Sequence, residues 1–446
     1  MDPGELGDGD LARQAIAVLD GNWMGHATRA SAHLYPHQWS WDSACIAIGY
    51  SGRNQERAEA ELRWIFAGQW QDGLLPHIRF ADDARYFPGP EFWQTERAAG
   101  APQHPKTSGI VQPPVHATAV LRVYQRAHDR DQARAFLQEL MPKLVAWHEY
   151  LYRERTRDGD GLVEIWHPWE SGMDNSPLWD EALARIAPER DSIPAYKRVD
   201  LDFVGADQRP SDAEYDRYAY LVKLYRELEY DPRRIREECP FVIDDVLFNS
   251  LLVQANRDLA EIARILGTNG ARFEAWAELT AAALEASLWD DEAACYADYD
   301  VRAAHRVRAH TAAAYAPLFA GIPTPERARR MRERLMAGTA VSIDGFGRVV
   351  ASVAPGDAHF DPALYWRGPV WPMINWVMCA GLRRYGFIEE AREIRGALLE
   401  LVRREGFWEH YNATTGRGQG TEQLSWTAGL VLDLLDGERD QGGGVS

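Results

Sequence analysis

The sequence predicts an all-α protein, an (α/α)6 barrel in which six helical hairpins close into a ring with long functional loops on one face. Three observations support this prediction. Apolar residues recur with the helical period in about a dozen segments, and the alternation typical of half-buried strands is scarce. Long aromatic loops separate many of these segments. No fixed repeat period marks the chain, which argues against an open α-solenoid.

The amphipathic segments follow one another along the whole chain, and several carry helix start and stop signals. Ser211 and Glu214 have the spacing of a capping box. Gly267 ends one segment, and Pro325 begins another. The predicted helices span 10–19, 55–70, 116–128, 132–152, 211–228, 243–266, 271–288, 311–319, 325–336, 365–384, 388–403 and 421–435.

The connections alternate between short polar turns and long segments that are rich in Gly, Pro and aromatic residues. Loops longer than about 15 residues inside a compact domain are usually functional or disordered. These long segments contain Trp, Tyr and single charges instead of Ser/Gly linker chemistry, which favours a functional role; they are 71–115, 155–180, 190–210, 340–365 and 404–420. Because no Pro/Ser-rich linker divides the chain, we predict a flexible N-terminus at 1–9, a single (α/α)6 catalytic domain at 10–436 and a disordered tail at 437–446.

The net charge of −18 narrows the choice of partners. Nucleic acid is not expected, because binding phosphates requires clustered cations. An anionic membrane surface is disfavoured for the same reason. No apolar run reaches the roughly 18 residues of a membrane span, and the N-terminal residues MDPGELGDGD lack the basic and apolar regions of a secretory signal. The chain is expected to be soluble and cytoplasmic, and a homo-oligomer stays open.

The four cysteines, Cys45, Cys239, Cys295 and Cys379, are far apart in the sequence and show no CxxC or Cys/His ligand spacing. Such cysteines are typical of buried free thiols in a cytosolic protein. We therefore expect neither a metal nor a cofactor.

Aromatic residues are abundant, with 17 Trp, 18 Tyr and 14 Phe. They can pack a large core, or they can form platforms for sugar rings, since an aromatic face combines apolar surface with polar handles at its edge. Aromatic residues that cluster beside acidic residues indicate a sugar site, whereas scattered ones are typical of a core. Four segments combine aromatic residues with charged groups: 35–42 (YPHQWSWD), 165–177 (IWHPWESGMDNSP), 365–371 (YWRGPVW) and 406–412 (GFWEHYN). Each alone is as well explained by a structural loop whose acid caps a helix, but four in one helical chain favour a sugar site.

These segments contain candidate acids for cleaving a glycosidic bond. Inverting hydrolysis needs one protonated carboxyl group and one ionised carboxylate, about 6.5–9.5 Å apart. Glu170 and Asp174 are both candidates for the proton donor, because Trp166 and Trp169 can remove them from water and raise the pKa of a carboxyl group. The chemistry of the residues alone leaves the choice between Glu170 and Asp174 open.

The motifs resemble those of glycoside hydrolase family 63, within it the bacterial branch that hydrolyses mannosylglycerate and glucosylglycerate. The resemblance runs from LYPHQWSWDS near the N-terminus, through WHPWESGMDNSP, RPSDAEYDRY, YWRGPVWPMINW and FWEHYNATTG, to QLSWTAG near the C-terminus. Trehalases of a related family share a similar ESGxD segment and a partner glutamate. The motifs therefore define the clan better than the substrate.

The resemblance implies a role for each matching residue. Asp174 matches the general acid and Glu409 the general base of an inverting reaction. From the chemistry of the neighbouring residues alone, His410 or Asn412 is expected to assist Glu409. Asp42 matches a carboxylate that binds sugar hydroxyl groups. The expected substrate-binding residues are Tyr35, Trp39, Trp41, Asp42, Tyr86, Gln112, Trp169, Arg209, Tyr215, Tyr365, Trp366 and Trp371.

Arg209 and Tyr215 indicate the class of substrate. A glycerate leaving group carries a carboxylate, which an arginine can bind in a bidentate manner, and the resembling branch uses an Arg and a Tyr of this kind. The alternative for Arg209 is a local ion pair with Asp207 or Asp212. We therefore expect hydrolysis of an α-linked glucosylglycerate or mannosylglycerate, with glucose favoured, to free hexose and glycerate.

Other functions stay open at this point. A neutral-substrate α-glucosidase or a trehalase-like hydrolase would use the same fold without a cation for the leaving group. A non-catalytic sugar-binding protein would keep the Trp platforms without needing both carboxyl groups. A sugar epimerase on the same fold would transfer protons at carbon, commonly with paired histidines, whereas the histidines of this chain are scattered.

Overall fold

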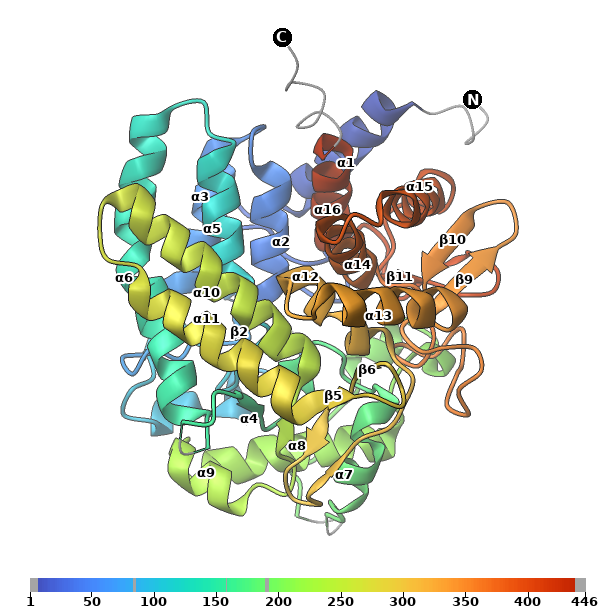
Figure 1. Cartoon of the computed structure of the whole chain (residues 1–446). Coiled ribbons are helices and arrows are strands. Elements are labelled where there is room, and N and C mark those ends of the chain that lie inside the picture. Colours follow the sequence, from blue (N-terminus) through green and yellow to red (C-terminus); the bar gives the residue numbers. More distant parts are fainter. Residues whose placement is uncertain (1–6, 83–85, 158, 189–191, 438–446) are drawn as a thin grey trace.

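Six inner helices of the computed structural model form a closed ring (Figure 1). The structure describes residues 7–82, 86–157, 159–188 and 192–437. Each inner helix packs against the next in chain order, and the last packs against the first, which closes the ring. The inner helices are α2 (Ser40–Tyr50), α5 (His116–Gln125), α10 (Val246–Leu266), α12 (Pro317–Ala320), α14 (Pro372–Arg384) and α16 (Ser425–Asp436). The predicted (α/α)6 barrel is confirmed.

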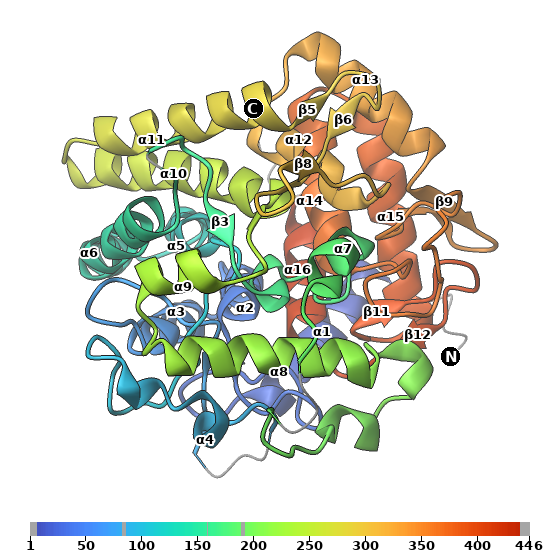
Figure 2. The ribbon, with the colours of Figure 1, turned by 90° about the horizontal axis from the view of Figure 1, so that it is seen from below.

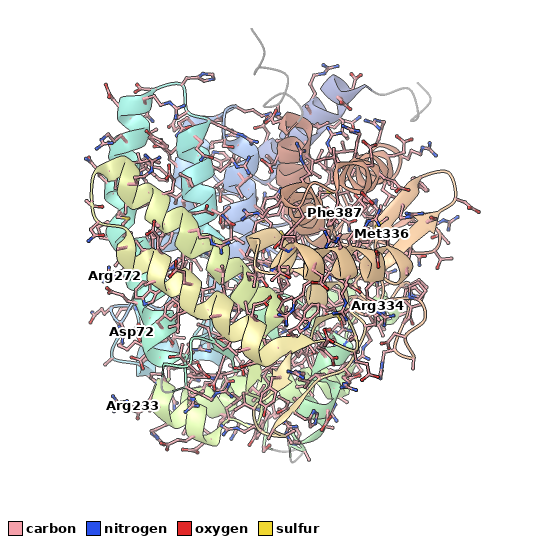
Figure 3. The ribbon with its side chains drawn as sticks, viewed as in Figure 1. Asp72, Arg233, Arg272, Arg334, Met336 and Phe387 are labelled. Carbon is pink, nitrogen blue, oxygen red and sulfur yellow. The ribbon has the colours of Figure 1, made fainter. Side chains whose placement is uncertain are left out.

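Six further helices surround this ring. Five of them pack directly on inner helices: α1 on α16, α3 on α2, α6 on α5 and α10, α11 on α10, and α15 on α14. Charged residues cover the outward faces, as for Arg272 on α11 and, near the loops, Arg233 on α9 (Pro232–Glu238; Figure 3). The outer helices are α1 (Asp8–Asn22), α3 (Gln55–Phe66), α6 (Arg130–Glu154), α11 (Ala271–Ala283), α13 (Pro325–Ala337) and α15 (Ile388–Glu405).

Whether a helix lies in the inner ring or outside it affects how clearly the sequence pattern indicates that helix. Every residue of α2 is buried. A helix that is apolar all round has no amphipathic period, and the sequence pattern consequently did not indicate α2. Three short helices were missed as well: α4 (Pro90–Trp93), α7 (Asp180–Ala184) and α9 (Pro232–Glu238).

Prolines and turns shift several predicted boundaries. The predicted helix 311–319 is instead a 3-10 turn (Ala312–Tyr315) followed by α12, which begins at Pro317. The predicted helix 365–384 begins only at Pro372, because proline lacks the N–H that an earlier turn would need. The capping box of Ser211 and Glu214 is present at the start of α8 (Asp212–Glu227). Gly267 ends α10 with a left-handed φ of 76°.

The two ends of the chain were predicted to be irregular. Helix α1 already begins at Asp8, inside the segment 1–9 that was expected to be flexible. Residues 1–6 and 438–446, which hold most of the two predicted flexible ends, lie outside the described residues. The four cysteines are free and buried, as predicted.

Short antiparallel strands tie the long loops together. The largest sheet has the order β3-β4-β7-β8, and the other sheets are two-stranded. β1 (Gln38–Trp39) pairs with β2 (Ile78–Arg79), and β11 (His410–Tyr411) pairs with β12 (Gly418–Gln419). The other strands are β3 (Glu164–Ile165), β4 (Ile243–Asp244), β5 (Trp289–Asp290), β6 (Cys295–Tyr296), β7 (Tyr299–Asp300), β8 (His305–Arg306), β9 (Ala340–Ile343) and β10 (Gly347–Val350).

The long loops gather at one end of the ring. In Figure 1 this end is the lower one, where α7, α8 and α9 lie, and Figure 2 views the molecule from that side. Residues at or next to the first turns of α2, α14 and α16 line a common cavity there. The amino-terminal ends of these helices carry partial positive charge, which suits a site that holds carboxylates.

Candidate active site

A cavity of about 80 Å³ lies at the loop end of the ring, and all fourteen residues expected to act in catalysis or substrate binding contribute to its wall. They come from segments spread over most of the chain and are Tyr35, Trp39, Trp41, Asp42, Tyr86, Gln112, Trp169, Asp174, Arg209, Tyr215, Tyr365, Trp366, Trp371 and Glu409. The sequence did not single out the other lining residues, His77, Ile78, Pro88, Gly172, Asp200, Pro210, Leu424 and Trp426.

Asp174 lies in the loop between two 3-10 turns, Pro168–Ser171 and Pro177–Trp179. Gly172 brings this loop against the ring of Trp41, since a Cβ at Gly172 would lie 2.6 Å from that ring. The hydroxyl of Tyr365 donates to Oδ2 of Asp174 over 3.4 Å. Burial raises the pKa of Asp174 to about 7, the charge of Arg209 lowers it, and the charge of Glu409 raises it. A carboxyl group of this kind can carry a proton near neutral pH.

Glu170, the other candidate for the proton donor, lies outside the cavity lining. Its side chain is fully buried and accepts hydrogen bonds from both terminal nitrogens of Arg155, at 2.8 and 2.9 Å. The backbone N–H groups of Trp166 and Val111 donate to it as well, at 2.6 and 3.2 Å. Glu170 therefore fastens the loop that carries Asp174. The negative charge that raises the pKa of Asp174 is that of Glu409.

Glu409 follows α15, where Gly406 turns the chain with a left-handed φ of 95°. The carboxylate is 4% exposed and accepts four hydrogen bonds. Tyr35 Oη donates to Oε1 over 2.6 Å, and the backbone N–H of Thr421 donates to Oε2 over 3.2 Å. Arg209 donates from Nη2 to Oε2 over 3.0 Å and from Nη1 to Oε1 over 3.5 Å.

The expected assistants of Glu409, His410 and Asn412, have other roles. The ring of His410 stacks on Trp371 with centroids 4.7 Å apart, and burial holds the pKa of His410 well below its usual value. The side chain of Asn412 accepts from the backbone N–H groups of Thr414 and Thr415 and so shapes the following turn. The sequence prediction for these two residues is wrong, because Tyr35 and Arg209 reach Glu409 from distant segments.

Gly420 leaves room for the carboxylate of Glu409. A Cβ at Gly420 would lie 2.2 Å from Oε2 of Glu409, and its φ is +75°. We expect Gly420→Ala to lower kcat at least tenfold, since a displacement of about 1 Å at a reacting group can cost about a hundredfold in rate. Steady-state hydrolysis kinetics measure this change.

Gly267→Ala is the matched control for Gly420→Ala. Gly267 has nearly the same φ, +76°, but a Cβ there would meet nothing within 4 Å. Gly267→Ala should lower the free energy of unfolding by about 1–2 kcal/mol, the cost of a left-handed backbone at a residue with a Cβ. Its kcat should be unchanged. Equal kcat values for the two alanine variants would contradict the role given to Gly420.

Arg209 is 4% exposed, and it pairs with Glu409 instead of the local partners Asp207 or Asp212. Asp212 pairs with Arg198. Within the described part of the chain, Nε of Arg209 is buried and has no hydrogen-bond acceptor. One edge of the guanidinium group is therefore available to an anion.

Aromatic rings form the walls around these charges. Trp366 and Trp371 stack face to face, with centroids 3.8 Å apart, and Trp41 meets Trp426 edge to face at 5.1 Å. The guanidinium of Arg198 covers the ring of Tyr215 at 3.6 Å. Such surfaces suit the C–H faces of a sugar and the stem of a small leaving group.

Asp42 occupies the first turn of α2 and is 9% exposed. Burial raises its pKa to about 7, and the charges of Glu409 and Asp174 contribute to the rise. Four carboxyl groups, those of Asp42, Asp174, Asp200 and Glu409, and the guanidinium group of Arg209 thus share the cavity. Their hydrogen-bonding capacity matches a small molecule with several hydroxyl groups and one negative charge.

Residues 35–427 match the family model described as the mannosylglycerate hydrolase MGH1-like glycoside hydrolase domain. The chain belongs to this family of glycoside hydrolases. A mannosylglycerate hydrolase from Rubrobacter radiotolerans is 49% identical over 96% of this chain and 97% of the relative. A glucosylglycerate hydrolase from Mycolicibacterium hassiacum is 39% identical over 95% of this chain and 97% of the relative.

A solved relative agrees with this family membership. The crystal structure of the GH63 mannosylglycerate hydrolase from Thermus thermophilus, in complex with Tris and D-glycerate, superposes with a TM-score of 0.88 at 43% identity. The match covers 95% of this chain and 99% of that one. The resemblance to glycoside hydrolase family 63 is confirmed, and the chain is a glycosidase, which disfavours the sugar-binding protein and the epimerase as alternatives.

The described residues contain neither a candidate metal site nor a membrane-spanning helix. No cluster of three or more His, Cys, Asp or Glu side chains in the described ranges has an arrangement that could hold a metal ion. None of the described helices combines the length and apolar character needed to cross a membrane.

Proposed function

We propose that this glycosidase hydrolyses an α-linked hexosylglycerate, glucosylglycerate or mannosylglycerate, to free hexose and glycerate with inversion at the anomeric carbon. The observation that carries the proposal is the position of Arg209. Its buried guanidinium group lies in the same cavity as Asp174 and Glu409, and its Nε edge has no acceptor among the described residues. A trehalase-like or neutral α-glucosidase has no need of such a cation, whereas a glycerate carboxylate binds it in a bidentate manner.

Asp174 is the proposed general acid and Glu409 the proposed general base. Asp174 gives its proton to the glycosidic oxygen as that bond breaks, while Glu409 takes a proton from the water that attacks the opposite face of the sugar. The pKa of about 7 allows Asp174 to be protonated near neutral pH. Arg209 contacts both oxygens of the Glu409 carboxylate, at 3.0 and 3.5 Å.

The remaining lining residues hold the two halves of the substrate. Asp42 accepts hydrogen bonds from sugar hydroxyl groups, with Trp39, Trp41, Trp366 and Trp371 as walls. Arg209 and Tyr215 face the glycerate, and the further contacts that we propose are Tyr35, Tyr86, Gln112, Trp169 and Tyr365. The names of the relatives include both hexoses, so the assay below uses both substrates.

The anomer of the first product tests the proposal. The purified protein is incubated with glucosylglycerate, mannosylglycerate and trehalose, and the fresh product is observed by NMR before mutarotation. We expect the β-anomer of the hexose from at least one of the two glycerates and little cleavage of trehalose. An initial α-anomer would overturn the roles of the two carboxyl groups, and preferential cleavage of trehalose would overturn the acidic leaving group.

The pH dependence follows from the proton on Asp174. Its pKa of about 7 in the free protein lies well above that of an ordinary carboxyl group. Because the general acid must be protonated, kcat/KM should fall about tenfold per pH unit as the pH rises beyond 7. A pH profile of kcat/KM measures this alkaline limb, and rates that stay constant up to pH 9 would contradict the assignment.

A further inference from the structure

Arg209 binds the proposed base directly. It contacts both oxygens of Glu409, and its Nη1 also donates to Tyr35 Oη over 2.8 Å. Tyr35 in turn donates to Glu409. The residue expected to hold the leaving group is thus joined directly to the residue expected to activate water.

This ion pair occupies the lone pairs that a nucleophilic water needs. The two oxygens of a carboxylate offer about four acceptor positions. Tyr35 and Arg209 use those of Oε1, and Arg209 and the backbone N–H of Thr421 use those of Oε2. A water molecule can bind Glu409 as a base only after one of these donors has left. Of these donors, Arg209 is the one that carries a positive charge, and a substrate carboxylate therefore competes for it.

We propose that the carboxylate of the leaving group releases the base: it draws the guanidinium of Arg209 away from Glu409 and so frees Oε2 to hold the attacking water. This inference rests on the proposed function. It makes the negative charge of the substrate a condition for catalysis, in addition to a contribution to binding.

The space in the cavity supports an exchange of partners. Pockets for small ligands usually measure about 300 Å³ or more, whereas the cavity holds about 80 Å³. Some of its side chains must therefore move when a hexosylglycerate enters. The unpartnered Nε of Arg209 gives the incoming carboxylate a first point of attachment before the bonds to Glu409 break.

The exchange also acts on the general acid. The positive charge of Arg209 lowers the pKa of Asp174. Once a substrate carboxylate neutralises that charge, Asp174 holds its proton more firmly until the glycosidic oxygen takes it. Asp174 then carries its proton, and Glu409 has an oxygen free to accept the attacking water, as the reaction requires.

The step itself balances without any further reagent. The water oxygen forms a bond to the anomeric carbon, and one water proton passes to Glu409. The bond between the anomeric carbon and the glycerate oxygen breaks, and that oxygen receives the proton of Asp174. Glu409 then releases its proton to solvent water, and Asp174 takes up a proton from it. With glycerate gone, the ionised Glu409 pairs again with Arg209.

Glycosyl fluorides separate release of the base from binding of the leaving group. α-D-Glucosyl fluoride and α-D-mannosyl fluoride need a base and a water molecule, but fluoride leaves without a proton, and the glycerate subsite stays empty. We expect added D-glycerate to raise kcat for fluoride release at least tenfold, a modest part of the roughly 10²–10⁴-fold contribution of a general base. Glycerol, which lacks the carboxylate, should give no activation.

Two variants accompany the measurement. Arg209→Gln should abolish the activation by glycerate, because no cation is left to change partners. Lys197→Gln is the matched control: Lys197 is a cation of the same loop, its side chain is 72% exposed, and it pairs with Asp202. This control should keep both the basal rate and the activation.

The possible results distinguish this inference from the proposed function. Activation by glycerate in the wild-type protein and in Lys197→Gln, but not in Arg209→Gln, supports release of the base. Simple inhibition by glycerate, or no effect at saturating glycerate, overturns it while hexosylglycerate hydrolysis stands. Failure to hydrolyse either fluoride or either hexosylglycerate overturns the proposed function itself.

Discussion

Asp174→Asn should lower kcat for a hexosylglycerate by two to four orders of magnitude, the usual contribution of a positioned general acid, about 10²–10⁴-fold. Asparagine keeps the size of the side chain and the contact with the hydroxyl of Tyr365, but it has no proton to give to the glycosidic oxygen. KM should change little, because Asp174 acts on the bond that breaks. Steady-state kinetics with both hexosylglycerates measure the loss.

The same variant provides its own control through the leaving group. Fluoride departs without a proton, so Asp174→Asn should retain most of the wild-type rate on the matching α-glycosyl fluoride, and the alkaline limb of the pH profile should disappear there. An equal loss on both substrates would show that Asp174 supports the structure of the site instead of donating a proton.

Arg155→Met should reduce the free energy of unfolding by about 3–5 kcal/mol, the usual cost of removing one partner from a buried ion pair. The side chains of Arg155 and Glu170 are 3% and 0% exposed. The guanidinium also lies 3.7 Å from the ring centroid of Trp166. Without Arg155, Glu170 would be a buried charge without a cation. Equilibrium urea denaturation measures the change.

A double variant distinguishes the lost ion pair from lost packing. Removing both charges in Arg155→Met with Glu170→Leu should recover part of the stability, since a buried pair can often be replaced by apolar groups. Arg153→Met, with a side chain that is 50% exposed in the same helix end, is the control and should change stability by less than about 1 kcal/mol. A loss below about 1 kcal/mol for Arg155→Met would contradict the structural role of the pair.

The sequence predicted the outer helices better than the inner ones. An outer helix such as α3 has one apolar face and one charged face, and this contrast produces a readable period. Helix α2 is buried on all sides and has no such contrast. The 3-10 turn and α12 were also misread, because burial of Ala312–Tyr315 resembles the apolar face of a continuous helix.

The site was predictable where acids and aromatic residues are close in sequence. The segments around Asp42, Asp174 and Glu409 met this condition, and the cavity unites them. His77 and Asp200 were missed, because the segments next to them lack the tryptophans that mark the other sites. The pair of Arg209 with Glu409 joins residues 200 positions apart, and only the closed ring brings them together.

The wall of the cavity is built from loops and first helical turns that belong to different parts of the ring. Asp42 belongs to α2, Trp371 precedes α14, and Leu424 precedes α16. Arg209 lies in a loop that ends at α8, outside the inner ring. Inherited changes in that one loop could therefore alter the preferred leaving group while the helices keep their packing. In this architecture, a new substrate preference can evolve in the loops at the mouth of the barrel while the helical core stays the same.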